Sequence, residues 1–410
     1  MKVLWIVNVA FPEVCRELGL PEPVLGGWLC GYRDALRAFC PDVQIDVIAP
    51  YPGKTLCHID CAGSRHYLFP DTMGHDALID WMRTVREAAR PEVVHLHGSE
   101  FFHALAWVKA NGSEHTVLSI QGLISVYANY YMGGIESEAL RRCRSFHDWR
   151  RHERLSDRQK RYAERGAYET ELLRLVSNVA GRTSWDRTHL WAVHPEARYF
   201  TCQEVLRQPF YDARWSLDAC RRHRIFLSQS HYPIKGLHKF LEALPLILRH
   251  YPDTVVHIVG DDPTRGRWYQ RSGYGNLIRH LIRTYKLKRH IHFVGRLDAD
   301  QMVAELREAH VFVCPSAIEN SSNSVCEAQL MGTPTVASYV GGLMDLVIDG
   351  RSGLLYRFEE TRMLAKKVCC IFADDDLAHR LSAGAYEAAS FRHRRGDIAR
   401  ALYDIYQAIR

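Results

Sequence analysis

Short apolar runs alternate with amphipathic stretches over the first half of the chain. The runs have the length of buried strands, and the stretches between them carry apolar residues at helical spacing. This pattern predicts strands at Val3–Val9, Gln44–Ala49, Val93–His97, Thr116–Ile120, Leu175–Ala180 and Arg198–Thr201, and helices at Trp28–Phe39, Ala77–Ala89 and Phe101–Lys109. Strands that alternate with helices are typical of a parallel sheet covered on both faces.

The same alternation restarts after a polar, aromatic stretch without clear periodicity, residues 206–222, which we interpret as a hinge. The second half predicts strands at Ile225–Ser228, Val255–Val259, His292–Val294, Val311–Cys314 and Thr335–Ala337, and helices at Gly236–Arg249, Asn276–Tyr285, Ala299–Glu308, Asn323–Met331 and Asp397–Ile409. We therefore expect an α/β protein with two doubly wound, Rossmann-like domains, residues 1–205 and 223–392, facing a central cleft. A C-terminal helix within 393–410 should pack back toward the first domain, and ligands should lie at the carboxyl ends of the strands.

The composition is that of a globular protein, with 47% apolar and 24% charged residues among 410. No apolar stretch reaches the ~18 residues of a membrane-spanning helix, and the apolar start has no small-residue cleavage site. The twelve cysteines are scattered, so we expect reduced thiols and a cytoplasmic location, with a peripheral place at the inner face of the membrane left open. Cys57 and Cys61 lack a matching pair at zinc-ligand spacing, so no metal site is expected.

The net charge of +6 is concentrated in one segment. Residues 138–165 carry ten Lys or Arg against five Asp or Glu, a net +5, so the chain has no broad basic face and nucleic acid is not an expected partner. Apolar and aromatic residues interrupt these arginines. Two interpretations stay open: an amphipathic helix lying on an anionic membrane, or a solvated helix whose arginines pair with Asp148, Glu153, Asp157 and Glu164.

Gly26 and Gly27 immediately precede the first predicted helix. Backbone without a Cβ can approach a phosphate closely, and helix-start N–H groups favour anions. A glycine pair is also common in ordinary turns, so both readings remain. No G-x-G-x-x-G follows the first strand, which argues against a dinucleotide-dependent dehydrogenase.

Two glutamates flank a predicted helix start in the second half. Glu319 lies in the loop after an apolar strand, and Glu327 lies eight residues later, inside the helix. Ser321, Ser322 and Asn323 between them suit a helix N-terminus. This order would match a sugar hydroxyl, a diphosphate and a ribose diol in line. An ordinary loop with two solvated glutamates is the alternative.

The E-x7-E element, the turn Gly332-Thr333-Pro334 that follows it, the first-loop glycine pair and Lys235-Gly236 together resemble the retaining family-4 glycosyltransferases of GT-B fold. The resemblance covers nearly the whole chain and is strongest from 235 to 353. It includes further matches at 259–262, 293–295 and 341–342.

The resemblance implies a hexosyltransferase that moves a sugar from a nucleoside diphosphate, most simply UDP, to a saccharide or lipid-linked acceptor with retained configuration. Lys235 would meet the donor diphosphate, Glu319 would hold sugar hydroxyls, and Glu327 would bind the ribose. The implied contacts beyond these three are backbone N–H groups of Asn323, Ser324, Val325 and Gly27 for phosphate, and Arg296 and Leu297 beside the base.

Two departures from the family pattern affect the candidate site. Gln229 stands where an Arg for the diphosphate is usual, and a neutral amide cannot replace a guanidinium. His231, Arg182 and Arg207 are open as substitutes. Gln121 stands where a His near the reacting sugar is common. His97 remains a second catalytic candidate in the cleft, whereas His95 is interpreted as a core residue.

No cofactor or metal is expected, because no Asp-x-Asp follows a predicted strand end where it could hold a metal–diphosphate complex. Asp374–Asp376 instead sits at a predicted helix start, where carboxylates favour the dipole. Two alternatives to a transferase are a sugar-nucleotide epimerase or phosphorylase of the same fold, and a non-catalytic protein that binds the nucleotide sugar.

Overall fold

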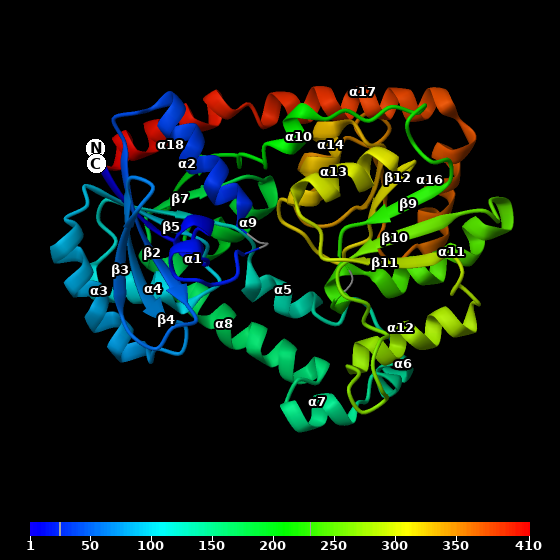
Figure 1. Cartoon of the computed structure of the whole chain (residues 1–410), viewed down its shortest axis with the longest axis horizontal. Coiled ribbons are helices and arrows are strands. Elements are labelled where there is room, and N and C mark those ends of the chain that lie inside the picture. The colour runs from blue at the N-terminus through cyan, green and yellow to red at the C-terminus, as the bar shows by residue number, and fades with distance from the viewer. Residues whose placement is uncertain (24–25, 230) are drawn as a thin grey trace. The chain divides into compact units, whose positions relative to one another are not determined.

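The computed structural model describes residues 1–23, 26–229 and 231–410 and divides into two units (Figure 1). Unit 1 comprises residues 1–125, 163–207 and 393–410, and unit 2 comprises 126–162 and 208–392. Residues 126–162, which the sequence analysis assigned to the first domain, therefore make their contacts within unit 2. The segment interpreted as a hinge contains a short helix, α10 (Pro209–Asp212).

Unit 1 is built on an eight-stranded sheet. Its strands are β1 (Lys2–Ile6), β2 (Gln44–Tyr51), β3 (Cys57–Cys61), β4 (Ser64–Pro70), β5 (Val93–His97), β6 (Thr116–Ser119), β7 (Asn178–Gly181) and β8 (Arg198–Thr201). Their order is β3-β4-β2-β1-β5-β6-β7-β8, and every pair is parallel except β3–β4. The antiparallel hairpin β3–β4 was not predicted, because its turn, Ala62-Gly63 with both φ positive, lacks the usual Asn-Gly signal.

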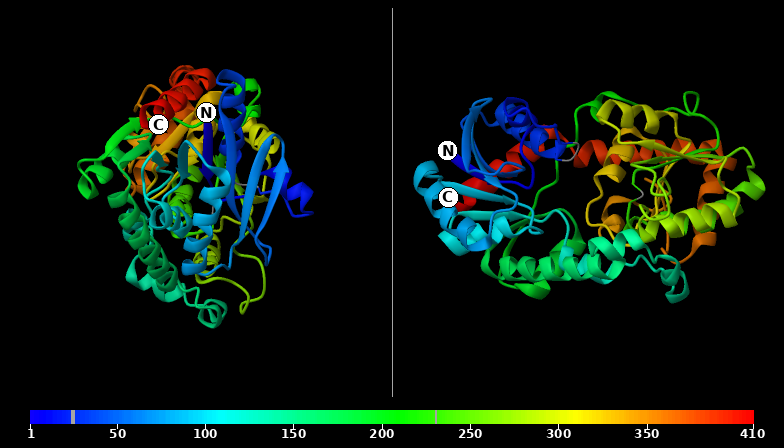
Figure 2. Two further views of the ribbon diagram at one scale, coloured as in Figure 1. Left: turned by 90° about the vertical axis from the view of Figure 1, so that its left-hand side faces the viewer. Right: turned by 60° about the horizontal axis from the view of Figure 1, so that its bottom comes forward.

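The helices of unit 1 are α1 (Pro12–Glu17), α2 (Gly27–Phe39), α3 (His75–Ala89), α4 (Phe102–Asn111), α9 (Ser184–Val193) and α18 (Arg395–Ile409), together with the C-terminal part of α8 (Leu155–Leu175). Helices α2 and α18 pack with alternate side chains of β1, Val3 and Trp5, in one core. The Trp5 indole N–H donates to Tyr406 Oη at 3.0 Å. The two chain ends lie side by side, and both ion-pair with Glu92 (Figure 2).

Unit 2 is built on a six-stranded sheet that is parallel throughout. Its strands are β9 (Arg224–Leu227), β10 (Val255–Val259), β11 (Ile291–Gly295), β12 (Val311–Cys314), β13 (Thr335–Ser338) and β14 (Leu354–Tyr356). The order β11-β10-β9-β12-β13-β14 is that of a Rossmann sheet, in which the winding direction reverses between the first and fourth strands. Ligand-binding loops are therefore expected after β9 and β12.

The helices of unit 2 follow the strands and add a segment from the first half of the chain. They are α5 (Ile124–Tyr130), α6 (Ser137–Arg142), α7 (Phe146–Arg151), α10, the 3₁₀ turn η1 (Pro233–Lys235), α11 (Leu237–His250), α12 (Gly273–Thr284), α13 (Ala299–Glu308), α14 (Asn323–Met331), α15 (Leu343–Leu346), α16 (Thr361–Ala373) and α17 (Asp375–Arg392). Helix α11 packs against α12 and α16, and α14 packs against α17. The expected α/β class with two doubly wound sheets is confirmed. Within the described residues, no helix has the length and apolarity needed to cross a membrane.

The basic segment 138–165 is not one helix, contrary to both sequence interpretations. It forms α6, α7 and the start of α8, separated by breaks at 143–145 and 152–154. Ser145 caps α7, since its Oγ accepts from the Asp148 N–H at 3.3 Å. His152, with φ of 53°, ends that helix in a left-handed conformation.

Candidate active site

The loops after β9 and β12 bring Lys235 and Glu319 together. Lys235 Nζ donates to Glu319 Oε1 at 2.6 Å, and the two side chains are only 18% and 9% exposed. The residues are 84 positions apart in the chain. The reversal of winding between β9 and β12 makes them neighbours, at the place where sheets of this order bind ligands.

The structure gives a physical reason for the glycine that follows Lys235 in the sequence. It adopts a left-handed conformation with φ of 69°, and a Cβ there would lie 1.7 Å from the carbonyl oxygen of Pro315. Only glycine allows η1 to pack this closely on the backbone that follows β12. A hydrogen bond from the Ala317 N–H to Ile234 O, at 2.6 Å, joins the same two loops.

The charges of Lys235 and Glu319 stabilise each other. Burial disfavours the charged ammonium group of Lys235, but the Glu319 carboxylate more than offsets this and holds the pKa of Lys235 above its ordinary value. Ser316 Oγ also donates to Glu319 Oε1, at 2.7 Å. Glu319 is thus an ion-paired, hydrogen-bonded carboxylate rather than the solvated loop residue of the alternative interpretation.

A second glycine pair supports the backbone of Glu319. The Gly342 N–H donates to Glu319 O at 2.9 Å. Gly341 has φ of 53°, and a Cβ there would lie 1.9 Å from the same oxygen. The loop that follows β13 therefore fixes the position of the loop that follows β12.

Helix α14 begins directly after this loop, with Ser322 at its N-cap. Asn323, Ser324 and Val325 form its first turn, which holds no acidic residue, so its free N–H groups present partial positive charge. Ser228 Oγ, after β9, donates to Ser324 Oγ at 3.0 Å. Glu327 lies one turn further along and is 4% exposed. Carboxylate, helix N-terminus and second carboxylate thus occur in the expected order.

The remaining candidates of unit 2 lie near the ends of β9, β10 and β11. Gln229 is exposed, and Ser230 after it lies outside the described residues. The His231 ring lies against Gly260, where a Cβ would come within 2.4 Å of Nε2, and burial lowers the pKa of this histidine. Arg296 is 70% exposed and pairs with Asp261 at 3.1 Å. Leu297, the next residue, is half-buried.

In unit 1, Gly26 is the left-handed N-cap of α2, with φ of 86°. A Cβ there would lie 2.6 Å from Val9 Cγ2, so the glycine is required by packing as well as by conformation. The side chain of Arg207 lies 3.0 Å from the Cβ position of Gly27. The first-loop glycines therefore adjoin one of the three cations considered as a substitute for the missing arginine.

Arg182 was also considered as a substitute for the missing arginine, but its side chain is bonded to other residues of unit 1. Its guanidinium pairs with Glu204 Oε2 at 2.7 Å, with both side chains buried. It also donates to Gln121 O at 2.7 Å. This bond fixes the backbone at Gln121, the residue that stands where a histidine is common.

His97 is buried, which corrects its expected availability. It is 1% exposed, and its ring stacks on His95 at 3.6 Å and lies edge-on to Trp5 at 4.5 Å. Residues two apart on a strand share a face, so His97 follows His95 into the core. Neither ring nitrogen of His97 has a hydrogen-bond partner, and burial holds its pKa well below the ordinary value.

His95 is a satisfied core residue, as interpreted from the sequence. It is fully buried, and its two ring nitrogens lie 2.7 Å from Tyr406 Oη and 2.7 Å from Ser119 Oγ. Tyr406 Oη thus accepts from the Trp5 indole and shares a hydrogen bond with His95 Nδ1.

Unit 1 has a pocket of about 510 Å³ where its own winding reverses, after β1 and β5. Its walls are aromatic and proline-rich, with Asn8 and His103 among the few polar groups. Asn8 accepts from His103 Nε2 at 2.8 Å and donates to Glu100 Oε1 at 2.9 Å. The other carboxylate oxygen of Glu100 is buried with no hydrogen-bond partner, and burial raises the pKa of Glu100 to about 7.

Three residues of these sites were missed by the sequence analysis. The Tyr127 hydroxyl accepts from the Asn320 N–H at 2.8 Å, across 193 residues of chain. Tyr127 lies on α5, a helix that the sequence analysis did not predict. Ser316 and Glu100 lie in loops after strands. Ser316 and Glu100 could have been found, because both are polar residues that follow a predicted strand. Nothing in the sequence indicated Tyr127.

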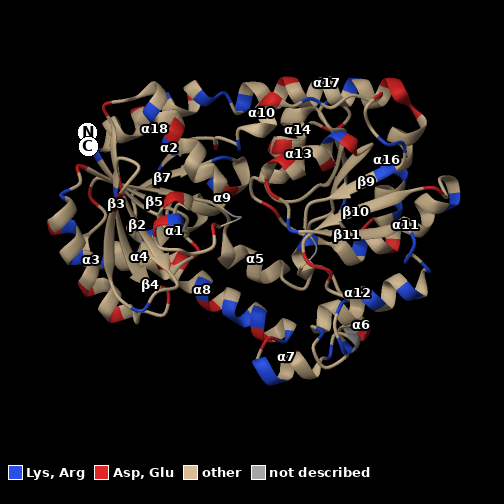
Figure 3. Cartoon of the chain, in the orientation of Figure 1, with Lys and Arg blue, Asp and Glu red and all other residues tan. Residues whose placement is uncertain are grey.

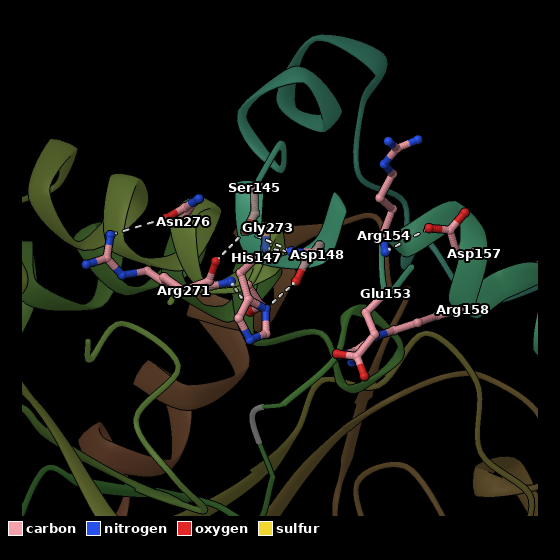
Figure 4. Close-up of polar contacts among 12 residues, drawn as sticks. Ser145, His147, Asp148, Glu153, Arg154, Asp157, Arg158, Arg271, Gly273 and Asn276 are labelled. Carbon is pink, nitrogen blue, oxygen red and sulfur yellow. Dashed lines mark hydrogen bonds and ion pairs between the residues drawn. The ribbon is translucent and has the colours of Figure 1, made fainter. Parts of the chain in front are cut away.

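Across the residues that the structure describes, one cluster of potential metal ligands occurs: His147, Asp148 and Glu153 (Figure 4). Asp148 Oδ2 accepts from the Gly273 N–H at 2.6 Å, and Glu153 pairs with Arg158 at 3.0 Å. Bonds within the protein thus account for both carboxylates, and none of these residues belongs to the candidate site.

Part of the chain is similar in sequence to known proteins. Residues 221–374 match the family described as Glycosyl transferases group 1. The glycogen synthase of Mycobacterium tuberculosis is 30% identical over 210 residues, which are 50% of this chain and 48% of that protein. The phosphatidyl-myo-inositol mannosyltransferase of Mycobacterium leprae is 29% identical over 187 residues, 45% of this chain and 46% of that protein. The chain spans about half the length of the curated relatives it matches.

Solved structures resemble the chain over its full length. Sucrose-phosphate synthase from Thermosynechococcus elongatus superposes with a TM-score of 0.72 at 17% identity, covering 100% of this chain and 99% of that one. Anabaena HepE, solved in complex with UDP-glucose, gives 0.69 at 15% identity and covers 100% of both chains. These likenesses show the fold. Residues 221–374 thus match the glycosyl transferases group 1 family, in a chain that has the GT-B fold.

Proposed function

We propose that this chain is a retaining glycosyltransferase that moves a hexose from a nucleoside diphosphate sugar to a saccharide or lipid-linked hydroxyl. The observation that carries the proposal is the Lys235–Glu319 pair beside the N-terminus of α14, at the reversal point of the sheet in unit 2. A UDP donor is supported by the complexes of HepE with UDP-glucose and with UDP, a protein of the same fold.

In this proposal the donor diphosphate meets Lys235 and the N–H groups of the first turn of α14. Charge grows on the diphosphate as the bond to the sugar breaks, and positive groups already in place stabilise that charge without reorganisation. Glu319 accepts hydrogen bonds from hydroxyls of the transferred sugar, and Glu327 from the nucleotide ribose. A front-face path, in which a donor phosphate oxygen takes the acceptor proton, rests on the family resemblance.

We assign the acceptor to the 510 Å³ pocket of unit 1. Aromatic side chains such as Phe69 and Phe102 offer flat apolar faces on which sugar rings can stack. Asn8, Asp71 and His103 supply hydrogen-bonding groups in the same walls. Few polar groups in an otherwise apolar pocket are typical of small-molecule sites.

A screen of nucleoside diphosphate sugars tests the donor proposal. UDP-, GDP- and ADP-linked hexoses are added singly, and thermal stabilisation and slow donor hydrolysis are measured. We expect one base to stabilise the wild type and to lose this effect in Glu327→Ala. Conversion of the donor to an epimer without any acceptor would instead identify the epimerase alternative. Binding with no turnover for any sugar and acceptor would favour the non-catalytic one.

Transfer should not need a metal ion, because Lys235 and helix N–H groups are proposed to meet the diphosphate charge. We expect EDTA to change the rate little. If EDTA abolished transfer and Mg²⁺ or Mn²⁺ restored it, the diphosphate would be held differently from this proposal.

A further inference from the structure

Two distant segments of unit 2 enclose a cavity of about 720 Å³ that the proposed reaction does not use. One runs from Met132 to Ser156, through α6 and α7, and the other is the stretch before and into α12, with Trp268 and Asn276. Most of the lining is apolar. Arg144 and Arg154 contribute charged groups to it.

The aromatic rings around this cavity are unusually open to solvent. Phe146 is 50% exposed, Trp149 57% and Trp268 71%. All three line the same cavity, so they form one patch rather than scattered exposed residues. A contiguous exposed apolar patch marks a surface that binds something apolar.

Helix α7 is held in place by polar bonds, not by burial of its rings. Asp148 Oδ2 accepts from the Gly273 N–H at 2.6 Å, and Ser145 Oγ donates to Arg271 O at 2.5 Å (Figure 4). Gly273 also packs on this segment, since a Cβ there would lie 1.6 Å from Cys143 O. The rings of α7 therefore remain exposed on a helix that is already fixed.

Three acidic residues of this segment bond within the protein. Besides the Asp148 bond, Glu153 pairs with Arg158, and Asp157 accepts from the backbone N–H of Arg154. The sequence alternative, in which these carboxylates pair with the arginines of the segment, therefore holds at Glu153 but not at Asp148.

Between residues 143 and 155, around α7, four exposed arginines have no ion pair with any described residue. They are Arg144, Arg150, Arg151 and Arg154. Figure 3 shows the Lys and Arg residues on α7 and along the first turns of α8. Arg144 and Arg154 line the cavity together with the exposed rings, and Arg150 and Arg151 follow Trp149 directly on α7. This combination complements a surface that is anionic outside and apolar beneath.

We propose that this patch docks unit 2 on an anionic phospholipid bilayer. Phe146, Trp149 and Trp268 lie at headgroup depth, where aromatic rings are favoured, and an acyl chain enters the cavity between them. The four arginines contact lipid phosphates, an attraction that salt screens. A broad soluble polyanion would use the arginines but would leave the rings and cavity empty. The proposal does not depend on the proposed sugar transfer.

Co-sedimentation of the whole chain with vesicles tests it. Phosphatidylcholine vesicles with and without phosphatidylglycerol are compared at low and high salt. We expect binding only to the anionic vesicles, falling steeply with salt. Reversal of Arg150 and Arg151 to Glu should weaken it on the order of 10²-fold, since each cation near such a surface contributes about 1 kcal/mol. The matched control is reversal of Arg249 and Arg307, which are exposed and unpaired on α11 and α13, among the described residues, and it should change binding little.

The rings are tested separately from the charges. The triple variant Phe146→Ala, Trp149→Ala and Trp268→Ala should lose vesicle binding but keep binding to heparin. The control Trp191→Ala, a 66% exposed tryptophan in unit 1, should keep both. Thermal melting checks that each variant is folded. Equal weakening by both arginine pairs, vesicle binding unchanged in the ring variant, or negligible binding to anionic vesicles at low salt would each overturn the proposal.

Discussion

Lys235 and Glu319 neutralise each other in this structure, so each variant leaves the other charge buried and alone. We expect Lys235→Ala and Glu319→Ala each to lower kcat/KM for sugar transfer on the order of 10²-fold or more, through lost stabilisation of the leaving diphosphate and the sugar. Lys239→Ala is the matched control. It removes a half-buried ion pair between Lys239 and Glu242, which both lie on α11 and outside the candidate site. Wild-type transfer rates in both site variants would show that the site lies elsewhere.

Glu100 should make the stability of unit 1 depend on pH. The folded carboxyl titrates near a pKa of about 7, whereas an unfolded chain releases that proton near about 4.3. Between these values the folded state holds more protons, so its stability falls as the pH rises. Glu100→Gln should remove this fall, gaining up to about 3 kcal/mol relative to wild type across that window.

Urea denaturation measures the free energy of unfolding of wild type and of Glu100→Gln at about pH 5 and at about pH 8, on either side of the folded pKa. Glu114→Gln is the control, since Glu114 is an exposed carboxylate of the same unit. Equal pH dependence in wild type and Glu100→Gln would contradict the buried, protonated carboxyl.

At the scale of the element, the close packing of η1 on the backbone after β12 requires glycine at position 236. Gly236→Ala should destabilise unit 2 by more than about 3 kcal/mol, because left-handed strain adds to a clash with a carbonyl oxygen. Gly350→Ala is the matched control. Its φ of 77° is similar, but nothing lies within 4 Å of the added Cβ, so only the strain of about 1–2 kcal/mol remains.

The two glycine variants are compared by urea unfolding and by donor binding. We expect Gly236→Ala to lose donor binding as well, since Lys235 precedes it directly. Equal destabilisation by the two substitutions would mean that the Pro315 backbone moves aside without loss.

Elements with strong periodicity were predicted well, and elements without it were missed. Strands β5, β8, β10 and β12 begin and end where the sequence analysis placed them. The edge hairpin β3–β4 was not predicted, because its Ala62-Gly63 turn lacks the usual hairpin signal. The short helices α5 to α7 were missed because each ends after one or two turns, which leaves little periodicity to detect.

At the scale of the whole molecule, unit 2 is assembled from two parts of the chain. His238 Nε2, on α11, bonds to Gly133 O at 2.7 Å, and Asn320 bonds to Tyr127. A fragment of residues 208–392 would leave these buried groups without partners. We expect it to melt at a lower temperature, and to bind hydrophobic dye more strongly, than the same fragment with 126–162 attached through a flexible linker.

Circular dichroism melting and dye fluorescence of the two fragments provide this measurement. The fragments differ only in α5 to α7 and the start of α8. Identical melting of both would show that residues 126–162 add nothing to the stability of unit 2.

The sequence by itself determined the α/β class, the two sheets and the central motif of the candidate site. Glu319 and Glu327 could be singled out because they flank a predicted helix start, a position set by local periodicity and capping. The role of Lys235, and the roles of the two glutamates toward a donor, came from the family resemblance. The positions of Gly236 and of Gly341-Gly342 followed from the same motif, although their physical reasons did not.

Only the tertiary structure decided which distant residues meet. Strand order places the loops after β9 and β12 together, and the packing of residues 126–162 within unit 2 brings Tyr127 to Asn320. The tertiary structure also joins residues 126–162 to unit 2 and leaves the arginines of α7 unpaired. Such contacts form only where all the buried polar groups find hydrogen-bond partners at the same time. A short stretch of sequence does not contain this information, because the partners come from distant parts of the chain.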